Sequence, residues 1–382
     1  MITGSKALIR DINSNLVLET IINQNPISRA SISKKLGLTK ATISAIVQEL
    51  IDRNLVIEIG SDDTNLGRKP ILLSFNKKSG YAISIDLAVD TITALLTNLS
   101  GENCKLKQVK TPSVASDIMD VLIHLIDSMI TLAPKTHYGL VGITFGIHGV
   151  TNNNKITFTP YYDLSEIDLA NHIEKHYNVP VFLENEANLS VIGEKTFMYD
   201  YPNIANISIH SGVGLGVIVN HNLHTGYSGH AGEFGHTIVE IDGKECPCGN
   251  HGCLEQYLSE RVLLQEYAAI KGLERVDFEC LTSMYQTGDQ DAIAIINKFI
   301  KYMSICVNNV LNTYNPDIVV INSSFTIFFP GLIKLIEDNL TSRMNTFYRI
   351  VPSALQDSSI LLGGICIAIK NFLGVNVLKL RN

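Results

Sequence analysis

The chain of 382 residues carries 30 Lys/Arg and 37 Asp/Glu, a net charge of -7, and 46% of its residues are hydrophobic. This composition excludes intrinsic disorder, collagen and coiled coil, and the length predicts two or three globular domains. No apolar run reaches the ~18 residues of a membrane span, and the first residues lack the apolar core of a signal peptide. Seven cysteines, an odd number, do not indicate a disulfide framework, so we expect a cytoplasmic protein without a membrane partner.

Positive charge is concentrated at the N-terminus. Residues 1–78 contain eleven Lys/Arg and seven Asp/Glu, whereas the remainder contains 19 basic and 30 acidic residues. A basic segment on an acidic body is expected where one part of a protein meets a polyanion and the other part does not. We therefore expect a polyanion as the partner of the first segment, and the helix-turn-helix predicted below makes double-stranded operator DNA the expected polyanion.

A winged helix-turn-helix is predicted over residues 1–78. Apolar spacing predicts a first helix at about 11–25 and a second at 28–35, which ends at Gly37. Thr39 is suited to cap a third helix, whose apolar residues recur on one buried face. Two helices joined by a tight turn that contains glycine are the layout of a helix-turn-helix.

The third helix and the wing are the predicted DNA-contacting surfaces. Small or polar residues of the helix face away from the apolar stripe and can lie against bases and phosphates in the major groove: Lys40, Thr42, Ser44, Ala45 and Gln48. Strands at 55–59 and 70–75 form the wing, and Arg68 and Lys69 near its tip suit the narrow minor groove. A small helical domain with a solvated face is the alternative interpretation.

From residue 81 onward, strands, hairpins and helices alternate, which predicts mixed α/β sheets. Strand hairpins are expected at 81–101 and 205–220, and a single strand at 318–322 within a mainly helical last third. The literal sequence shows no internal repeat.

A cysteine-rich loop predicts a metal site. Cys246, Cys248 and Cys253 lie within eight residues, and His236 precedes the first of them by ten residues. Three thiolates and one imidazole form a closed tetrahedral set for zinc, which is typical of a structural site. His251, inside the loop, is an alternative fourth ligand, and three unliganded thiols are the alternative to a metal site.

Carboxylate and amide side chains flank this loop. Glu233, His236 and Glu255 lie on either side of it, and Asn185 and Glu186 occur at an upstream strand-to-helix junction. Converging Glu, Asn and His side chains can bind the hydroxyls of a polyol. Taken singly, each of them is more often a surface residue or a helix cap.

These motifs resemble the ROK family (repressors, open reading frames and kinases). GHAGEFGH, CPCGNHGCLE and the upstream ENEAN carry the resemblance, which covers nearly the whole chain, and the helix-turn-helix ending in LGRKP is similar to the repressor branch. The resemblance implies an α/β fold in which the winged helix-turn-helix precedes a two-lobed actin-like (ribonuclease-H-like) ATPase fold. The lobes would span residues 79–200 and 201–382, with dimerisation helices in the second and a C-terminal helix that can return to the first.

The same resemblance implies the site residues. The implied zinc ligands are His236, Cys246, Cys248 and Cys253. The implied sugar-binding residues, between the lobes, are Asn185, Glu186, Glu233, His236 and Glu255. The ENEAN version of the motif is most similar to that of xylose repressors, so a pentose is the first expected effector of a homo-oligomeric repressor of carbohydrate-metabolism genes.

A sugar kinase tethered to DNA is the principal alternative. By comparison with the family's kinases, residues 86–90 lack the glycines of a DxGGT phosphate loop, and residues 212–216 have Val213 where a GTGxG loop has Thr. Residues 322–324 replace a Gly-Gly pair. Glu186 stands where these kinases have a catalytic Asp, and a displacement of about 1 Å can cost ~100-fold in rate. We therefore expect no catalysis and no bound ATP.

His148 stands where the family often has Pro, and we expect this loop histidine to be solvated rather than to contact a ligand. The acidic body favours an unphosphorylated sugar. Control by a protein partner in place of a sugar is a further alternative that no sequence feature excludes.

Overall fold

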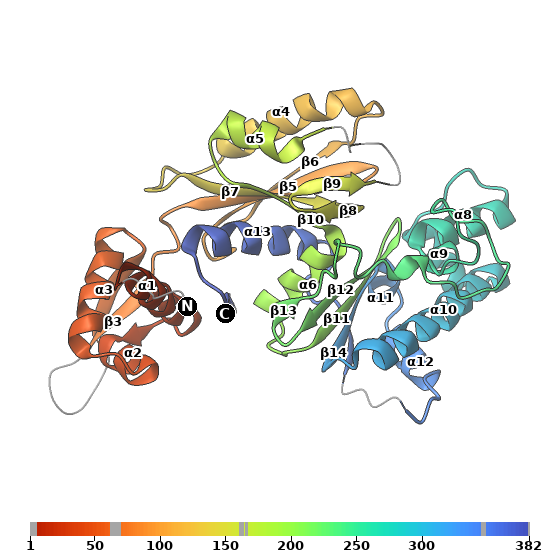
Figure 1. The fold of residues 1–382 in the computed structure, drawn as a ribbon. Helices are drawn as coiled ribbons and strands as arrows, with labels where there is room; N and C mark the ends of the chain where they lie inside the picture. The colour runs from red at the N-terminus through yellow and green to blue at the C-terminus, as the bar shows by residue number, and fades with distance from the viewer. Residues whose placement is uncertain (1–5, 62–69, 160–163, 165–166, 345–348, 381–382) are drawn as a thin grey trace.

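The N-terminal segment folds as a winged helix-turn-helix. The computed structural model describes residues 6–61, 70–159, 164, 167–344 and 349–380 (Figure 1). The elements of this segment are α1 (Lys6–Asn23), β1 (Ile27–Ser28), α2 (Arg29–Leu36), α3 (Lys40–Asp52), β2 (Val56–Ser61) and β3 (Ile71–Phe75). In the small sheet, β3 pairs antiparallel with both β1 and β2.

Side-chain caps and one glycine set the helix boundaries of this segment. The hydroxyl of Ser28 accepts the backbone N–H of Ser31 at the start of α2. The hydroxyl of Thr39 accepts the backbone N–H of Thr42 at the start of α3. Gly37 ends α2 with a φ of 67°, a left-handed conformation that favours glycine. The predicted helix-turn-helix is confirmed.

The first helix begins earlier than the sequence predicted. α1 starts at Lys6 rather than near residue 11. Ile9 and Ile12 are 52% and 51% exposed, and the fully buried apolar positions of the helix begin only at Val17. The prediction was wrong because apolar spacing detects a buried helix face, and the first turns of α1 do not have one.

The body contains two five-stranded sheets of the same connectivity. The strands of the first sheet are, in spatial order, β10 (Val181–Asn185), β7 (Leu140–Ile147), β4 (Tyr81–Leu87), β5 (Thr91–Asn98) and β6 (Lys105–Lys110). Those of the second are β15 (Ile350–Pro352), β14 (Ile318–Asn322), β11 (Ile204–Ile209), β12 (Val213–Val219) and β13 (Asn222–Leu223). Each sheet begins with an antiparallel meander and adds two parallel strands beside the first strand. The two sheets therefore repeat one strand arrangement. Buried strand positions accept many different apolar residues, so this structural repeat is not visible as a repeated amino-acid sequence.

Helices cover one face of each sheet. α4 (Ile118–Ile130), which follows the short turn η1 (Ala115–Asp117), and α5 (Leu169–Tyr177) lie over the first sheet, beside the hairpin of β8 (Val150–Asn152) and β9 (Lys155–Phe158) (Figure 1). The second sheet packs against α7 (Glu255–Leu258), α8 (Glu260–Lys271), α9 (Phe278–Gln286), α10 (Gln290–Tyr314), α11 (Ser324–Phe328) and α12 (Leu332–Asp338). Within the described ranges, no helix has the length and hydropathy needed to cross a bilayer.

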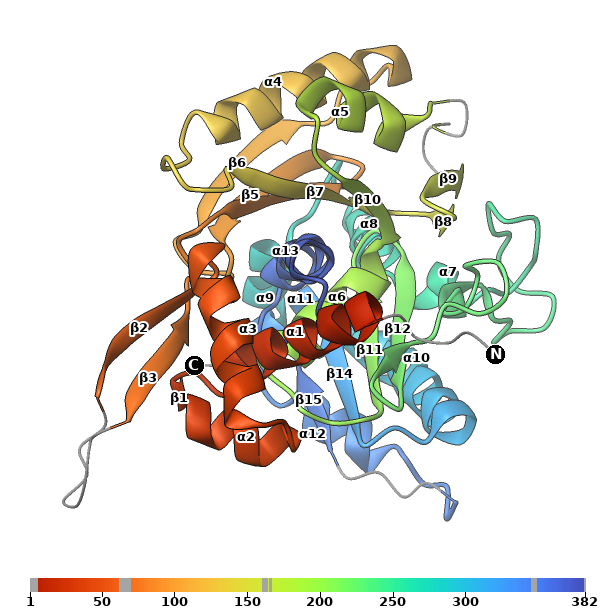
Figure 2. The same ribbon diagram turned by 60° about the vertical axis from the view of Figure 1, so that its left-hand side comes forward.

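Two helices fill the space between the sheets. α6 (Glu186–Phe197) packs on β11 and β12, α13 (Ser358–Leu373) packs on β4 and β7, and the two helices pack on each other (Figure 2). Glycine permits their close approach, because a Cβ at Gly363 would lie 1.9 Å from the carbonyl oxygen of Leu189. The C-terminal helix thus lies against the first sheet although it follows the second sheet in the chain.

The winged helix-turn-helix shares a hydrophobic core with the body. Ile21 of α1 and Leu378, beyond α13, belong to one buried cluster that also includes residues of α13 and of the first sheet. The segment after α13 runs beside α1 (Figure 1), where the Glu19 carboxylate accepts the backbone N–H groups of Asn376 and Val377 at 2.8 and 3.0 Å. The winged helix-turn-helix is therefore packed on the body rather than joined to it by a linker alone.

Candidate functional site

A cleft at the junction of the two sheets brings together all five side chains that were predicted to bind a sugar. Asn185 and Glu186 lie where β10 passes into α6, Glu233 and His236 lie at the short turn η2 (Phe234–His236), and Glu255 begins α7. The lining of the cleft also includes His148, Phe158, His210, Gly212 and Gly214. Three segments that are far apart in the sequence therefore meet at one site.

The junction of β10 and α6 is held by Asn185. Its side-chain oxygen accepts the backbone N–H groups of Ala187 and Asn188, which caps α6. Its amide group donates to the carbonyl oxygen of Gly149 at 2.9 Å. Most of the hydrogen-bonding capacity of Asn185 is thus used within the protein, and its main structural effect is to place Glu186 at the edge of the cleft.

Three carboxylates surround the cleft. Glu186 accepts the hydroxyl of Ser208 at 3.0 Å, and Glu255 accepts the backbone N–H of Val213 at 3.2 Å. The pKa of Glu233 is raised, mainly because the side chain is buried. The charges of Glu186 and Glu255 also raise it, whereas His236 and His230 lower it. Ionised carboxylates only accept hydrogen bonds, so the cleft is suited to a ligand that presents several hydroxyl donors.

Two glycines permit these carboxylates to reach the cleft. A Cβ at Gly212 would lie 2.8 Å from Oε2 of Glu255, and a Cβ at Gly214 would lie 2.9 Å from Oε1 of Glu186. A side chain at either position would collide with one of these carboxylates. The two glycines therefore have a structural reason that does not involve a phosphate group.

His148 is not solvated, contrary to the expectation from the sequence. Its Nε2 lies 2.8 Å from Oδ1 of Asp86, and the side chains are only 13% and 18% exposed. Burial lowers the pKa of His148, but the charge and hydrogen bond of Asp86, with a contribution from Glu186, outweigh it and raise the pKa to about 9. A charged His148 is held at the edge of the cleft by an ion pair that joins β4 to the loop after β7.

The hairpin between β11 and β12 forms part of the lining of the cleft. Val213 is the first residue of β12, pairs with Ile209, and is buried in the core. Val213 also contributes to the lining of the cleft next to Gly212, and its apolar side chain offers no hydroxyl there. The turn itself consists of residues 210–212, where His210 lies at the cleft.

The residues after β14 bind a buried carboxylate. Ser323 and Ser324 donate their hydroxyls to Glu260 at 2.8 and 3.0 Å, and the backbone N–H of Ser324 also donates to it. Burial raises the pKa of Glu260, while the hydrogen bonds from the two serines lower it. This network occupies the segment where the family's kinases were expected to have a Gly-Gly pair.

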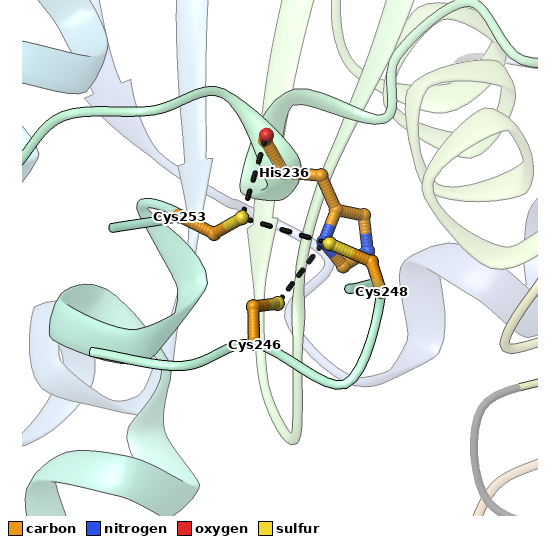
Figure 3. A group of neighbouring side chains, drawn as sticks. All are labelled: His236, Cys246, Cys248 and Cys253. Carbon is orange, nitrogen blue, oxygen red and sulfur yellow. Dashed lines mark hydrogen bonds between the residues drawn. The ribbon is translucent and has the colours of Figure 1, made fainter. Parts of the chain in front are cut away.

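The four predicted metal ligands form one cluster beside the cleft (Figure 3). One ligand atom from each of His236, Cys246, Cys248 and Cys253 lies within 4.8 Å of the others. The separation is 3.5 Å between Sγ of Cys246 and Nδ1 of His236, and 3.7 Å between the sulfurs of Cys248 and Cys253. Tetrahedral zinc with Zn–S bonds of about 2.3 Å and Zn–N bonds of about 2.0 Å requires ligand separations of roughly 3.5–3.8 Å.

The donor set also fits a cation chemically. Burial and the neighbouring thiols raise the pKa of Cys253 to about 12, so a metal ion would stabilise the thiolate that this site otherwise disfavours. His251 lies outside the cluster, with a side chain that is 58% exposed and 3.9 Å from Glu245. Of the two candidates for the fourth ligand, His236 is the one that the fold brings to the cysteines.

The predicted DNA-contacting residues of α3 lie on one exposed surface. Lys40, Ser44, Ala45 and Gln48 are exposed, whereas Thr42 is half-buried and its hydroxyl is bonded to that of Thr39. A hollow beside α3 is lined by Lys40 and Ser44 and, from neighbouring elements, by Arg29, Pro70 and Ile71. Arg68 and Lys69 lie outside the described residues.

Comparison with known proteins identifies the family. Residues 82–371 match the model of the ROK family. The chain belongs to the ROK family. This ROK protein is 37% identical to a xylose repressor of Bacillus spizizenii and 35% identical to the xylose repressor of Bacillus subtilis, in each case over 97% of this chain and 98% of the relative. A DNA-binding transcriptional dual regulator of Escherichia coli, NagC, is 25% identical over 93% of this chain and 92% of that protein.

Solved structures support the same assignment. A ROK family transcriptional regulator, a homologue of the E. coli MLC protein, has a TM-score of 0.79 at 25% identity, over 96% of this chain and 98% of that one. A ROK glucokinase from Streptomyces griseus, solved with glucose and AMPPNP, has a TM-score of 0.67 at 22% identity, over 75% of this chain and 99% of that one. The second likeness shows the fold of the body alone. The predicted helix-turn-helix followed by a two-lobed actin-like fold is confirmed for this ROK protein.

The ion pair of His148 and Asp86 is what sequence reasoning missed in this ROK protein. The two residues are 62 positions apart and belong to separate motifs. The sequence contained a signal for this pair. His148 replaces a proline that the family often has, and Asp86 lacks the glycines that follow it in the phosphate loop of the family's kinases. Only the parallel pairing of β4 with β7 shows that the two departures meet.

Proposed function

We propose that this protein is a DNA-binding repressor of carbohydrate-metabolism genes, and that a monosaccharide bound in the cleft changes its affinity for operator DNA. The convergence of the five predicted side chains on one cleft is the observation that carries the proposal. The relatives named xylose repressors make D-xylose the first choice of effector. The division into a DNA-binding unit of residues 1–78 and lobes of 79–200 and 201–382 is part of the proposal.

The proposed sugar site uses acceptors and a rigid loop. Glu186, Glu233 and Glu255 would accept hydrogen bonds from sugar hydroxyls, with Asn185 and His236 at the edges of the ligand. Zinc bound by His236 and the three cysteines would fix the position of η2 relative to the start of α7. It would thereby hold Glu233 and Glu255 in place. The zinc is structural in this proposal, because its four protein ligands leave no open position.

A route from the cleft to the DNA-binding segment supports the regulatory part of the proposal. α6 begins at the cleft with Glu186, and near its other end the carbonyl oxygen of Thr196 accepts the backbone N–H of Leu380. The same C-terminal segment is bonded to Glu19 of α1. A sugar that shifts α6 would therefore move the segment on which α1 rests, and a coupling of about 1–3 kcal/mol would suffice to release DNA.

Three features support a body without kinase activity or bound ATP. Asp86, which stands in the first phosphate-loop motif, is paired with His148. His210 belongs to the turn of the second loop and lines the cleft. The hydroxyls of Ser323 and Ser324 are bonded to Glu260, in the segment where the family's kinases were expected to have a Gly-Gly pair. Phosphoryl transfer depends on positioning of the phosphates, and in the first and third of these segments the polar side chains are bonded within the protein instead.

The recognition surface would consist of residues of α3 and of the wing: Lys40, Thr42, Ser44, Gln48, Arg68 and Lys69. A homodimer would place two such surfaces on successive half-sites. In this kind of motif the half-sites are about 34–36 Å apart. Arg29, at the hollow beside α3, is paired with Glu58 at 2.7 Å, so its charge is balanced within the protein.

The experiment is a DNA-release assay on the full chain. A duplex selected by the protein from a randomised pool is titrated by fluorescence anisotropy with and without D-xylose. We expect D-xylose to weaken DNA binding of the wild type, and Glu233→Gln to bind the same duplex without responding to sugar. Glu279→Gln, an exposed carboxylate of α9, is the matched control and should respond normally.

Two outcomes would contradict the proposal. Unchanged DNA affinity in a panel of aldoses and N-acetylated sugars would remove the sugar as effector and favour a protein partner. Sugar-dependent consumption of ATP by the wild type would show that the body is a kinase.

A further inference from the structure

The cleft is rich in hydrogen-bond acceptors and poor in donors. Glu186, Glu233 and Glu255 can only accept when ionised. The amide of Asn185 has two N–H groups and already donates one of them to Gly149, and His236 is the other donor of the predicted set at the cleft. Each hydroxyl oxygen of a sugar, and its ring oxygen, also has lone pairs that need donors once water is excluded. A ligand held by carboxylates alone would leave these oxygens without partners.

His148 has the geometry of a further donor. It lines the cleft, and its Nε2 is bonded to Asp86 at 2.8 Å, which fixes the plane of the ring. Among the described residues, no group forms a hydrogen bond with the other ring nitrogen, Nδ1, and that atom is not enclosed by protein. Because Asp86 keeps the ring protonated, both nitrogens carry a hydrogen, and the one on Nδ1 is available to a ligand.

We propose that His148 is a specificity-determining residue of the sugar site, that its Nδ1–H donates to an oxygen of the ligand, and that Asp86 is the positioning residue that orients the ring. This inference rests on the proposed sugar-binding function and deepens it.

The charges of the site select the class of ligand. The positive charge of His148 is balanced by Asp86, so the pair contributes no net charge to the cleft. Among the described residues that line the cleft, the other charged groups are the three carboxylates, which repel an anion. The ligand is therefore an uncharged monosaccharide, and a sugar phosphate or a sugar acid of the same skeleton binds more weakly.

Two isosteric variants separate the functions of the two ring nitrogens. The amide of Gln lies near the position of Nε2, so His148→Gln keeps a bond to Asp86 and loses the donor at Nδ1. The amide of Asn lies near the position of Nδ1, so His148→Asn keeps a donor to the ligand and loses the bond to Asp86. Calorimetric titration of the zinc-loaded full chain with D-xylose, D-xylonate and D-xylose 5-phosphate then measures both variants and the wild type.

We expect His148→Gln to weaken D-xylose binding by at least about 10-fold, the loss typical of one hydrogen bond to a charged group. His148→Asn should recover much of this affinity. Asp86→Asn, which retains an oxygen acceptor for Nε2, should lose less affinity than His148→Gln. All three variants should keep the zinc content and the sugar-free DNA affinity of the wild type, readouts that a general structural defect would change.

The outcomes are distinguishable. Wild-type xylose affinity in His148→Gln would overturn the role of His148 while leaving the proposed function intact. Tighter binding of D-xylonate or D-xylose 5-phosphate than of D-xylose would overturn the charge argument. Absence of binding of any of the three probes to the wild type would contradict this inference, and it would overturn the proposed function as well if the DNA-release assay also showed no response to a panel of sugars.

Discussion

At the scale of single residues, the role of a side chain in the cleft depends on the residue that it contacts. His148 considered alone is a loop histidine, and Asp86 considered alone is the remnant of a phosphate loop. Together they form a buried ion pair at the edge of the proposed sugar site. The pair is possible because β4 and β7 are parallel neighbours and both end at the cleft.

The ion pair predicts a pH dependence of stability. A histidine whose pKa is raised by folding stabilises the fold fully below its ordinary value of 6.5 and loses this contribution as the pH rises through about 9. The free energy of unfolding should therefore fall over this interval in the wild type, by at most about 3 kcal/mol from this group. Denaturant unfolding at a series of pH values measures the effect.

The matched variants are His148→Gln, which has no titrating ring, and His172→Gln, an exposed histidine of α5. The decline should be smaller in the first variant and unchanged in the second. An identical decline in the wild type and in His148→Gln would show that other groups cause it.

The metal cluster gives a second prediction at this scale. Cys248→Ser removes one of four ligands, so the variant should purify with little zinc and should bind D-xylose at least about 10-fold more weakly, as is typical when metal-site support is lost. Elemental analysis and calorimetric titration measure the two effects. Cys104→Ser, at an exposed cysteine outside the cluster, is the control. A zinc-free variant with normal sugar affinity would contradict the supporting role of the metal.

At the scale of elements, α6 and the C-terminal segment connect the cleft to the DNA-binding segment. Glu19 of α1 accepts two backbone N–H groups of that segment, and Asn23 donates to the carbonyl oxygen of Val377. These bonds hold α1 against the body, and no local sequence pattern indicates them because they join residues more than 350 positions apart.

Glu19→Ala should therefore loosen this contact. We expect the free energy of unfolding to fall by about 1–3 kcal/mol, the usual cost of removing a charged hydrogen-bond partner, and the effect of D-xylose on DNA affinity to decrease. Asp11→Ala, at an exposed carboxylate of the same helix, should change stability by less than about 0.5 kcal/mol. Thermal melts and the DNA-release assay measure the two effects. A normal response to sugar in Glu19→Ala would show that the signal takes another route.

At the scale of the whole molecule, the proposed function requires two copies. A pseudo-palindromic operator is bound by two recognition helices, so the protein should sediment in solution with twice its chain mass of 42.0 kDa. Sedimentation velocity over a range of concentrations measures the mass with and without DNA. A monomer that binds the selected duplex with full affinity would contradict the dimer.

Much of the architecture could be predicted from the chain alone. The cap at Thr39, the strand hairpins and the spacing of the three cysteines are local features, because each depends on residues that are close in sequence. The family motifs extended these local signals to the two-lobed fold. The start of α1 was placed wrongly because its first turns are exposed, and a buried apolar face is the only helix signal that sequence spacing provides there.

The sequence by itself determined the helix-turn-helix and the three cysteines of the metal cluster, since residue type and spacing specify local geometry and donor chemistry. The five polar residues of the cleft were implied by the resemblance to the ROK family. Tertiary structure decided which of these groups meet. The pairing of His148 with Asp86, the choice of His236 over His251, the repeated sheet topology and the contact of the C-terminal segment with α1 all join residues through packing. Contacts between distant segments depend on how the whole chain packs, so no local sequence pattern predicts them.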